Sequence, residues 1–313
     1  VHIFDAGPLR PVAAGGGNEI FAFIPRALFK GANHPAGIQA LTYQDGGVPI
    51  YRKHMYVDSS PRQADIFDGT NWRTIVVGGL GKGGNSYWAL NLTNVSAADE
   101  TQAAAKVMWE WSDPEVKYSY GRPVVVKVRD SAYPNGRWVV IVTGGYDNTS
   151  GEGMIFFLDA VTGAEINRLS TGVGTSPAAG QAAGLAQIHA FVKSQANQVA
   201  EQIYGGDLLG NVWRWDISAT NSYKNPATTA VRFARLTDPS GVPQPVTTAP
   251  RIEIDINNGT DRYLFVGTGR LLETSVEASD FEREILLPAW RRFATWTYDL
   301  SGVVSAEDAP ILM

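Results

Sequence analysis

Cysteine is absent from this 313-residue chain, which excludes disulfides and thiolate metal sites. Zinc is also not expected, because no two of the 4 histidines have the spacing of a ligand pair: His2, His34, His54 and His189. Lys and Arg are not clustered and the net charge is about −5, so we expect no nucleic-acid binding. No apolar run approaches the roughly 20 residues of a membrane-spanning helix, so we expect no transmembrane segment.

Glycine and short apolar runs are abundant. The chain contains 33 glycines and 17 prolines, and 44% of its residues are apolar while only 18% are charged. This balance suits short strands and many turns better than long helices. The opening "VHIFDAG" has the pattern of a strand end, so we interpret the chain as a fragment of a longer precursor whose targeting signal lies upstream.

One sequence motif recurs along the chain: an apolar run, two glycines, a polar turn and an aromatic-rich run. It reads "TIVVGGLGKGGNSYWALNLTN", "VVIVTGGYDNTSGEGMIFFLDAVTG", "QIYGGDLLGNVWRWDIS" and, for its first half, "RYLFVGTGRLLE". Its first glycines are Gly78, Gly144, Gly205 and Gly267, at intervals of 66, 61 and 62 residues. A nearly fixed period of this kind indicates stacked or radially arranged repeats.

Each repeat is predicted to form four short strands, because its apolar runs are β-branched or aromatic and are bounded by Gly, Asn or Asp. In the clearest repeat the predicted strands are residues 122–128, 137–145, 154–160 and 165–171. Asp159 and Asp216 are placed to hydrogen-bond the following turn, and the paired glycines to adopt positive φ. We therefore predict an all-β fold, a quinoprotein-like β-propeller of four-stranded antiparallel blades with long loop insertions.

The period of 61 to 66 residues exceeds the roughly 40–50 residues of ordinary blades, so inserts are expected. The longest candidates are residues 30–60, 96–106, 179–202 and 277–292. We predict a single propeller domain over residues 1–313, with a partial unit at 1–30, three fuller units to about 240 and a last unit to 304. A ring of about seven blades would need further strands in the inserts or outside this chain.

Several segments occur in the order found in one known family: "HIFDA", "GNEIFAFIPRAL", "YVDSSPRQAD", "YGRPVVVKV", "GGYDNTSGEGMIFFLDAVTG", "YGGDLLGNVWRWDIS" and "FVGTGRLLE". Over residues 2–272 the chain resembles the C-terminal propeller of the PilY-type type IV pilus biogenesis factors. The resemblance implies a non-enzymatic, tip-associated adhesin that promotes pilus assembly or opposes retraction through protein contacts on propeller loops. It also implies an extracytoplasmic location, in the periplasm, at the outer-membrane surface or at the pilus tip.

The resemblance further implies partners and a metal ion. The implied partners are minor pilins, the N-terminal region of the same precursor and a host-cell surface, with the inserts at 30–60 and 179–202 as the first places to look. The implied metal is calcium, which some members bind in an Asp/Asn-rich loop just before the segment matching residues 204–211. Here residues 187–202 hold one acidic residue, Glu201, whereas Ca²⁺ takes about six to eight oxygen ligands, which argues against a site there.

A different loop is the best candidate for calcium. In "DINNGTD" the oxygen ligands alternate as a hard-cation loop requires, through Asp255, Asn257, the Gly259 carbonyl and Asp261. The acidic residue expected at the twelfth position of such a loop is replaced by Val266. The alternative interpretation is an ordinary Asn- and Gly-rich hairpin turn.

Other motifs are predicted to be structural. "GGYDNTSGEG" offers Asp147, Asn148 and Glu152 to a metal but fits a hairpin turn, and "GLGKGGN" lacks the Walker spacing of a phosphate loop. Most strand tryptophans are expected to pack between blades: Trp88, Trp138, Trp213, Trp215 and Trp296. 

The alternative function is a pyrroloquinoline-quinone-dependent dehydrogenase, because "FFLDAVTG" resembles a blade ending of those propellers. The vicinal cysteine pair that many of them need is impossible here, and repeated tryptophan-docking signatures are not evident. A propeller scaffold of another secretion complex is a third interpretation.

Overall fold

The computed structural model describes residues 1–6, 16–29, 37–38, 44–45, 48–49, 55–194, 196–254, 262–270 and 295–299. Among these residues strands dominate, and the α-helical part is a single short segment, α1 (Glu100–Ala104). None of the helices in this part of the chain has the length and apolarity needed to cross a membrane. The predicted all-β fold is confirmed.

Three four-stranded antiparallel sheets and one three-stranded sheet follow one another along the chain. The first sheet contains β5 (Arg62–Phe67), β6 (Trp72–Gly79), β7 (Ser86–Asn91) and β8 (Val107–Ser112). The second contains β9 (Val124–Asp130), β10 (Tyr133–Thr143), β11 (Met154–Asp159) and β12 (Glu165–Ser170). The third contains β13 (Ile188–Val192), β14 (Ala200–Gly206), β15 (Asn211–Asp216) and β16 (Val231–Arg235). The fourth contains β17 (Arg251–Ile254), β18 (Arg262–Gly267) and β19 (Thr295–Asp299).

Smaller elements complete the described structure. Two further hairpins are β1 (His2–Phe4) with β2 (Glu19–Ala22), and β3 (Gln44–Asp45) with β4 (Val48–Pro49). The 3₁₀ helices are η1 (Arg26–Leu28), η4 (Pro177–Ala179) and η5 (Ser222–Lys224).

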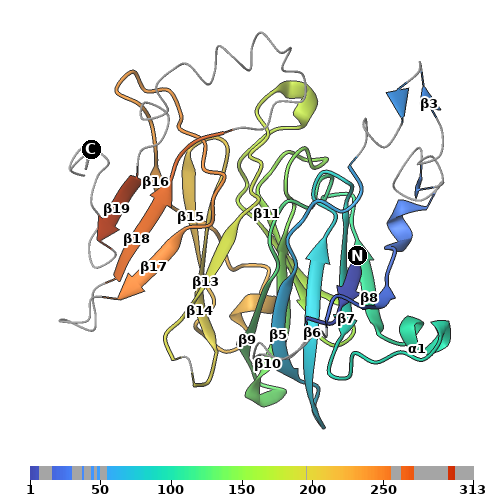
Figure 1. Cartoon of the computed structure of the whole chain (residues 1–313). Helices are drawn as coiled ribbons and strands as arrows, with labels where there is room; N and C mark the ends of the chain where they lie inside the picture. The colour runs from blue at the N-terminus through green and yellow to red at the C-terminus, as the bar shows by residue number, and fades with distance from the viewer. Residues whose placement is uncertain are drawn as a thin grey trace.

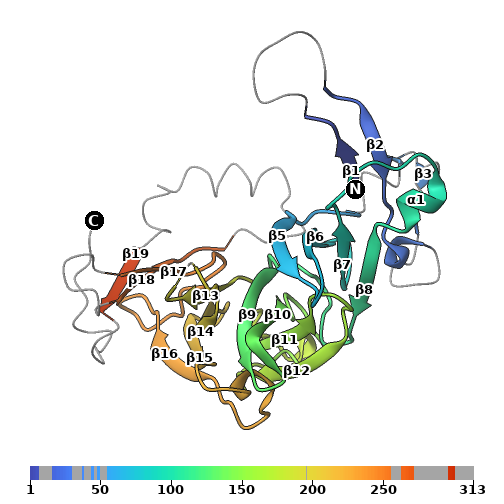
Figure 2. The ribbon, with the colours of Figure 1, turned by 90° about the horizontal axis from the view of Figure 1, so that it is seen from below.

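The sheets stand side by side like the blades of a propeller, and Figure 1 shows them in chain order. Seen from below, they follow an arc whose concave side is lined by the first strand of each sheet: β5, β9, β13 and β17 (Figure 2). The last strands, β8, β12 and β16, lie on the convex side. We call the space beside the four first strands the channel, because this is where a propeller has its central channel.

Neighbouring sheets pack face to face, and both faces of the second sheet are buried. Along β10, Trp138 and Val140 pack toward the first sheet, whereas Val139 and Ile141 pack toward the third. Because successive strand residues point to opposite faces, a strand buried on both sides reads as a continuous apolar run. This explains why "RWVVIV" and "MIFFLD" show no alternation of polar and apolar residues.

The repeated glycines occupy equivalent places, at or just beyond the end of the second strand of each sheet. Gly78 pairs with Trp88 of β7, Gly205 pairs with Trp213 of β15, and Gly267 pairs with Thr295 of β19. Gly144 directly follows β10 and donates its N–H to the Met154 carbonyl at 2.9 Å. The propeller period is therefore confirmed.

The reason for these glycines differs from the predicted one. Positive φ is found at Gly145, but not at the four repeated positions themselves. A Cβ at Gly78 would lie 2.4 Å from the Trp88 ring, so glycine there lets an indole cross the backbone. Close packing, rather than turn geometry, is what this position requires.

The predicted inserts need one correction. Residues 179–202 are not an insert, because they contain all of β13 and the start of β14. Residues 96–106 do form an excursion, which carries α1. The insert at 277–292 and most of the one at 30–60 lie outside the described residues.

The predicted turn and tryptophan roles are confirmed where the structure describes them. The Asp159 carboxylate accepts from the Val161 and Thr162 N–H groups at 3.0 and 2.9 Å, and that of Asp216 accepts from the Ser218 N–H at 2.9 Å. The strand tryptophans buried in the packing between β-elements are Trp88, Trp138, Trp213 and Trp215.

A tryptophan contact joins the first two sheets. It was not predicted from the sequence. Trp109 of β8 lies against Gly163 in the β11–β12 turn, where a Cβ would be 2.5 Å from its ring. Its indole N–H donates to the Ala160 carbonyl at 3.1 Å. Gly163 has a φ of 71°, so both its conformation and its neighbour favour glycine.

Candidate functional site

The channel contains a cavity of about 650 Å³ between β9, β13 and β17. Its charged wall is formed by five residues, which we call the channel cluster: Arg62, Arg122, His189, Arg251 and Glu253. Arg62 belongs to β5, Arg122 precedes β9, His189 lies on β13, and the last two lie on β17. Four sheets thus bring together residues that are up to 191 positions apart in the sequence. 

The charges of the channel cluster are unequally paired. The Arg251 Nε lies 2.7 Å from a Glu253 carboxylate oxygen. Arg62 and Arg122 have no acidic partner among the described residues. Burial, and then the positive charge of Arg251, lowers the pKa of His189, so this imidazole is neutral at pH 7.

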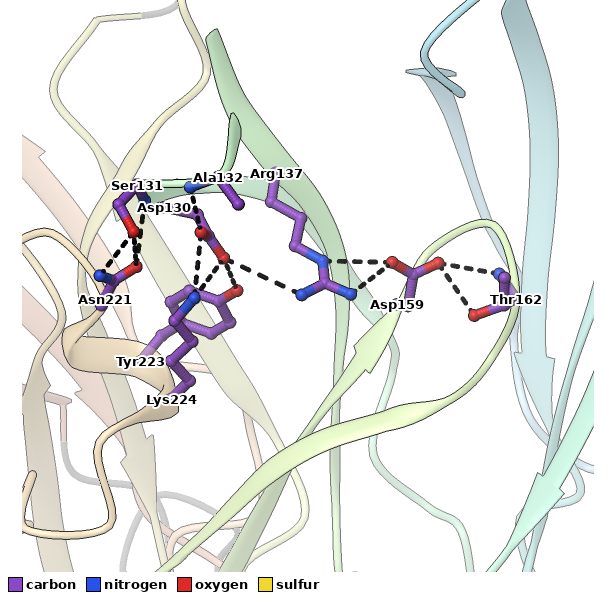
Figure 3. Close-up of polar contacts among 9 residues, drawn as sticks. All are labelled: Asp130, Ser131, Ala132, Arg137, Asp159, Thr162, Asn221, Tyr223 and Lys224. Carbon is purple, nitrogen blue, oxygen red and sulfur yellow. Dashed lines mark hydrogen bonds and ion pairs between the residues drawn. The ribbon is translucent and has the colours of Figure 1, made fainter. Parts of the chain in front are cut away.

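A second polar cluster lies at the seam between the second and third sheets (Figure 3). At its centre is the fully buried carboxylate of Asp130, at the end of β9. It accepts hydrogen bonds from the Tyr223 hydroxyl and from Lys224 Nζ, the latter at 3.0 Å. Arg137 lies 3.9 Å away and links this carboxylate to Asp159, at 2.9 Å. We call these five residues the seam network.

Electrostatics in the seam network favour the ionised form of Asp130. Burial alone would raise its pKa, but hydrogen bonds from Tyr223, Ala132 and Lys224 outweigh this, so the pKa lies below its ordinary value. Burial, followed by the hydrogen bond to the Asp130 carboxylate, raises the pKa of Tyr223. Because η5 belongs to the third sheet's β15–β16 connection, the network joins two blades. We interpret the network as a structural contact that holds these two blades together.

Another buried carboxylate, that of Asp207, shapes the turn between β14 and β15. One of its oxygens accepts the Leu209 and Asn211 N–H groups at 2.9 and 2.8 Å. The other accepts the Asn211 amide and the Trp213 indole N–H at 2.9 and 2.7 Å. Burial raises the pKa of Asp207, and these donors oppose the rise. All partners of its carboxylate lie within six residues, so this side chain fixes a local turn.

Exposed aromatic side chains occur at the hairpins that join the first and second strands of the first two sheets. We call them the hairpin-tip patch: Phe67 and Trp72 flank the β5–β6 turn, and Tyr133 begins β10. Their exposed fractions are 42%, 61% and 44%. The rings of Trp72 and Phe67 are 5.7 Å apart, and Trp72 also meets Trp138 edge-on at 6.3 Å. Exposed aromatic groups of this kind are typical of interaction surfaces.

The predicted calcium loop stays a prediction, because its residues lie outside the described part of the chain. Asp255, Asn257, Gly259 and Asp261 lie outside the described residues, which show only that Ile254 and Arg262 on either side are paired. The Glu201 carboxylate lies 3.3 Å from Arg129. The part of the chain that the structure describes contains no group of three or more potential acidic or histidine ligands.

The remaining predicted loops are turns. Residues 144–153 join β10 to β11, where the Asn148 amide donates to the Glu115 carboxylate at 3.1 Å and to the Glu152 carbonyl at 2.9 Å. "GLGKGGN" joins β6 to β7, and its Leu80 N–H donates to the Ser119 hydroxyl at 2.8 Å.

Comparison with known proteins agrees with this geometry. The family model described as the PilY1 β-propeller domain matches residues 9–284, most of the chain. The chain belongs to this family. The resemblance read from the strand and turn segments is therefore confirmed. The fold also matches the crystal structure of the Pseudomonas aeruginosa PilY1 C-terminal domain, with a TM-score of 0.62 and 25% identity, over 90% of this chain and 53% of that one.

Curated relatives of this PilY1-family chain are much longer than it is. It is 30% identical to the Pseudomonas aeruginosa type IV pilus biogenesis factor PilY1 over 289 residues, which are 85% of this chain and 22% of the relative. It is 28% identical to a PilY1 homologue of Xylella fastidiosa over 268 residues, 81% of this chain and 17% of the relative. The chain therefore spans about a fifth of the length of these PilY1 proteins.

The channel cluster and the seam network of this PilY1-family propeller were not found from the sequence. Both bring together single polar or charged residues from parts of the chain that are far apart in sequence. The hairpin-tip patch had a weak local signal, because "IFDGTNW" places two aromatic residues around an Asp-Gly turn. Exposure of such residues depends on the neighbouring sheet and is not visible in a strand pattern.

Proposed function

We propose that this propeller is the protein-binding part of a non-enzymatic type IV pilus biogenesis factor. It promotes pilus assembly or opposes retraction, and acts as a tip-associated adhesin, through contacts with minor pilins, with the rest of its own precursor and with a host surface. The names of the relatives support the pilus role. This proposal places the chain outside the cytoplasm, in the periplasm, at the outer-membrane surface or at the pilus tip.

The observation that carries the protein-binding role is the hairpin-tip patch. Trp72, Phe67 and Tyr133 come from two adjacent sheets, so a rigid scaffold holds them in place. Buried aromatic residues supply much of the energy of protein interfaces, and exposing them without a partner is unfavourable. The Arg137 guanidinium lies 5.1 Å from the Tyr133 ring and adds a cation beside the patch.

A pull-down with the minor pilins of the same organism tests this proposal. The variant Phe67→Ala/Trp72→Ala is expected to capture pilins at least about tenfold less well than the unmodified chain, because it removes two aromatic anchors. The matched control is Val242→Ala, which truncates an exposed apolar residue in the turn after β16.

Capture that depends on the patch and not on Val242 supports the proposal. If the unmodified chain captures no pilin, the proposed partner is wrong. If both variants capture pilins as well as the unmodified chain does, the patch is not the docking surface.

We also propose that the loop at residues 255–261 binds calcium through Asp255, Asn257, Gly259 and Asp261. The alternation of oxygen ligands in the sequence supports it, and the paired strands on either side hold the ends of the loop together. Calcium at tenfold its dissociation constant would stabilise the chain by about 1.4 kcal/mol. Thermal melting should show this increase, and Asp255→Ala/Asp261→Ala should abolish it. No shift, or an equal shift in the variant, would contradict the proposal.

A quinone-dependent dehydrogenase is the alternative, favoured by the contact between Trp109 and the β11–β12 turn, which places one docked tryptophan on an "LDAVTG" ending. Adding pyrroloquinoline quinone, calcium and an alcohol with an artificial electron acceptor distinguishes the two functions. Dye reduction with turnover would overturn the non-enzymatic assignment.

A further inference from the structure

The channel cavity combines positive charge with open strand edges. Three arginines and one glutamate in the channel cluster give a net charge of +2 with His189 neutral, in a chain whose overall net charge is −5. Two of the arginines, Arg62 and Arg122, are exposed and have no acidic partner within the described ranges. A concave site that concentrates one sign of charge attracts ligands of the opposite sign.

The backbone of the cavity wall can also bind a ligand. In their sheets β9, β13 and β17 are first strands, each paired in its sheet with the second strand alone, so their other edges face the channel. Part of the β9 edge is already used, since the Lys127 N–H donates to the Gln198 carbonyl at 3.1 Å. Apart from this contact and the Arg129 carbonyl, which accepts from the Asn221 N–H, no backbone bonds within the described residues occupy these edges. Their remaining outward N–H and C=O groups can therefore pair with an extended peptide.

Apolar residues line the same cavity between the charges. The partly exposed ones are Val124 and Val125 of β9, Val192 of β13 and Ile254 of β17. An extended peptide presents side chains alternately to its two sides, so it could place carboxylates on the arginines and its other side chains on these apolar residues.

We propose that the channel cavity binds an extended peptide segment rich in Asp or Glu, with its carboxylates on Arg62 and Arg122 and its backbone along the free strand edges. A peptide fits these features better than a nucleic acid or a sulfated polysaccharide, because it alone uses the strand edges and the apolar lining as well as the charge. This inference goes beyond the proposed pilus role and does not depend on it.

Fluorescence anisotropy with a labelled hexaglutamate peptide tests the inference on the unmodified chain at low salt. We expect saturable binding that Arg62→Glu/Arg122→Glu weakens at least about tenfold, because both carboxylate partners are replaced by like charges. The matched control is Arg232→Glu/Arg235→Glu, which makes the same charge change at exposed positions of β16, on the convex side. Circular dichroism and melting confirm that both variants are folded.

The outcomes separate the alternatives. Binding that is lost in the channel variant and kept in the β16 variant supports the proposal. Absence of hexaglutamate binding overturns it, as does equal weakening by both variants, which would show attraction by net charge alone. Tighter binding of a hexanucleotide or of a heparin hexasaccharide, competing with hexaglutamate, would overturn the peptide assignment in favour of a general polyanion site.

Discussion

The seam network and the channel cluster are both built from charged residues of neighbouring sheets, yet their charges are used differently. In the seam, Asp130 is buried and contacts Tyr223, Lys224 and Arg137. In the channel, Arg62 and Arg122 are exposed and have no acidic partner in the described structure. The difference indicates that satisfied, buried charges hold the blades together, whereas exposed, unpaired charges are available to a ligand. Variants can separate the two roles.

The largest effect is expected from Asp130→Ala. Removing this carboxylate leaves Lys224 and Arg137 without their buried partner, which typically costs about 3 kcal/mol or more in the free energy of unfolding. Urea denaturation measures the loss. Arg122→Ala is the channel counterpart and should change stability by less than about 0.5 kcal/mol. Equal losses in the two variants would remove the distinction between seam and channel.

A smaller effect in the same region is expected from Tyr223→Phe. The substitution keeps the buried ring against Phe157 and removes only the hydroxyl that donates to Asp130. Loss of a hydrogen bond to a charged group costs about 2 kcal/mol. The double variant Asp130→Ala/Tyr223→Phe should then be less destabilised than the sum of the two single variants, since they share one interaction. Simple additivity would show that the hydroxyl acts independently of this carboxylate.

The smallest effect concerns His189 in the channel. Its pKa is lowered in the folded chain by burial, by Arg251 and by Arg62, against the opposing effect of Glu253. The unfolded chain, with an ordinary histidine pKa of about 6.5, therefore binds more protons just below that pH. The contribution of His189 to the free energy of unfolding is therefore fully present above about pH 6.5, where the imidazole is neutral in both states. It is lost as the pH falls toward the folded-state pKa, because the unfolded chain takes up the proton first.

Denaturation at pH 7.5 and pH 5.5 measures this dependence. The loss of stability between the two pH values should be smaller in His189→Gln than in the unmodified chain. A loss that is the same in both proteins would mean that other groups cause it.

The fold was largely predictable because the second and third sheets bury both faces of their central strands. Long apolar runs such as "VVIVT" then need no further context to be recognised as strands. β13 was missed for the opposite reason. It lies on the channel, where His189 and the nearby Lys193 interrupt its short apolar run, and we took it for part of an insert.

Helix α1 and the channel cluster differ in how far the sequence could have predicted them. Helix α1 could have been predicted from local capping residues. The Asp99 carboxylate accepts from the Gln102 N–H at 2.8 Å, and the Gln102 side chain accepts from the Ala98 N–H at 3.1 Å. The channel cluster had no such local signal. Its members are ordinary strand-end residues until four sheets place them around one cavity, so only the assembled fold reveals them.

The first hairpin has a practical consequence for anyone shortening this chain. Phe21 and Phe23, together with Leu28 of η1, cover Trp88 and Leu90 on the outer face of the first sheet. A version trimmed to start at β5 would leave that indole and leucine uncovered by these residues and would be prone to self-association. Residues 16–29 thus cover this face of the first sheet, and a truncated protein must retain them to stay monodisperse.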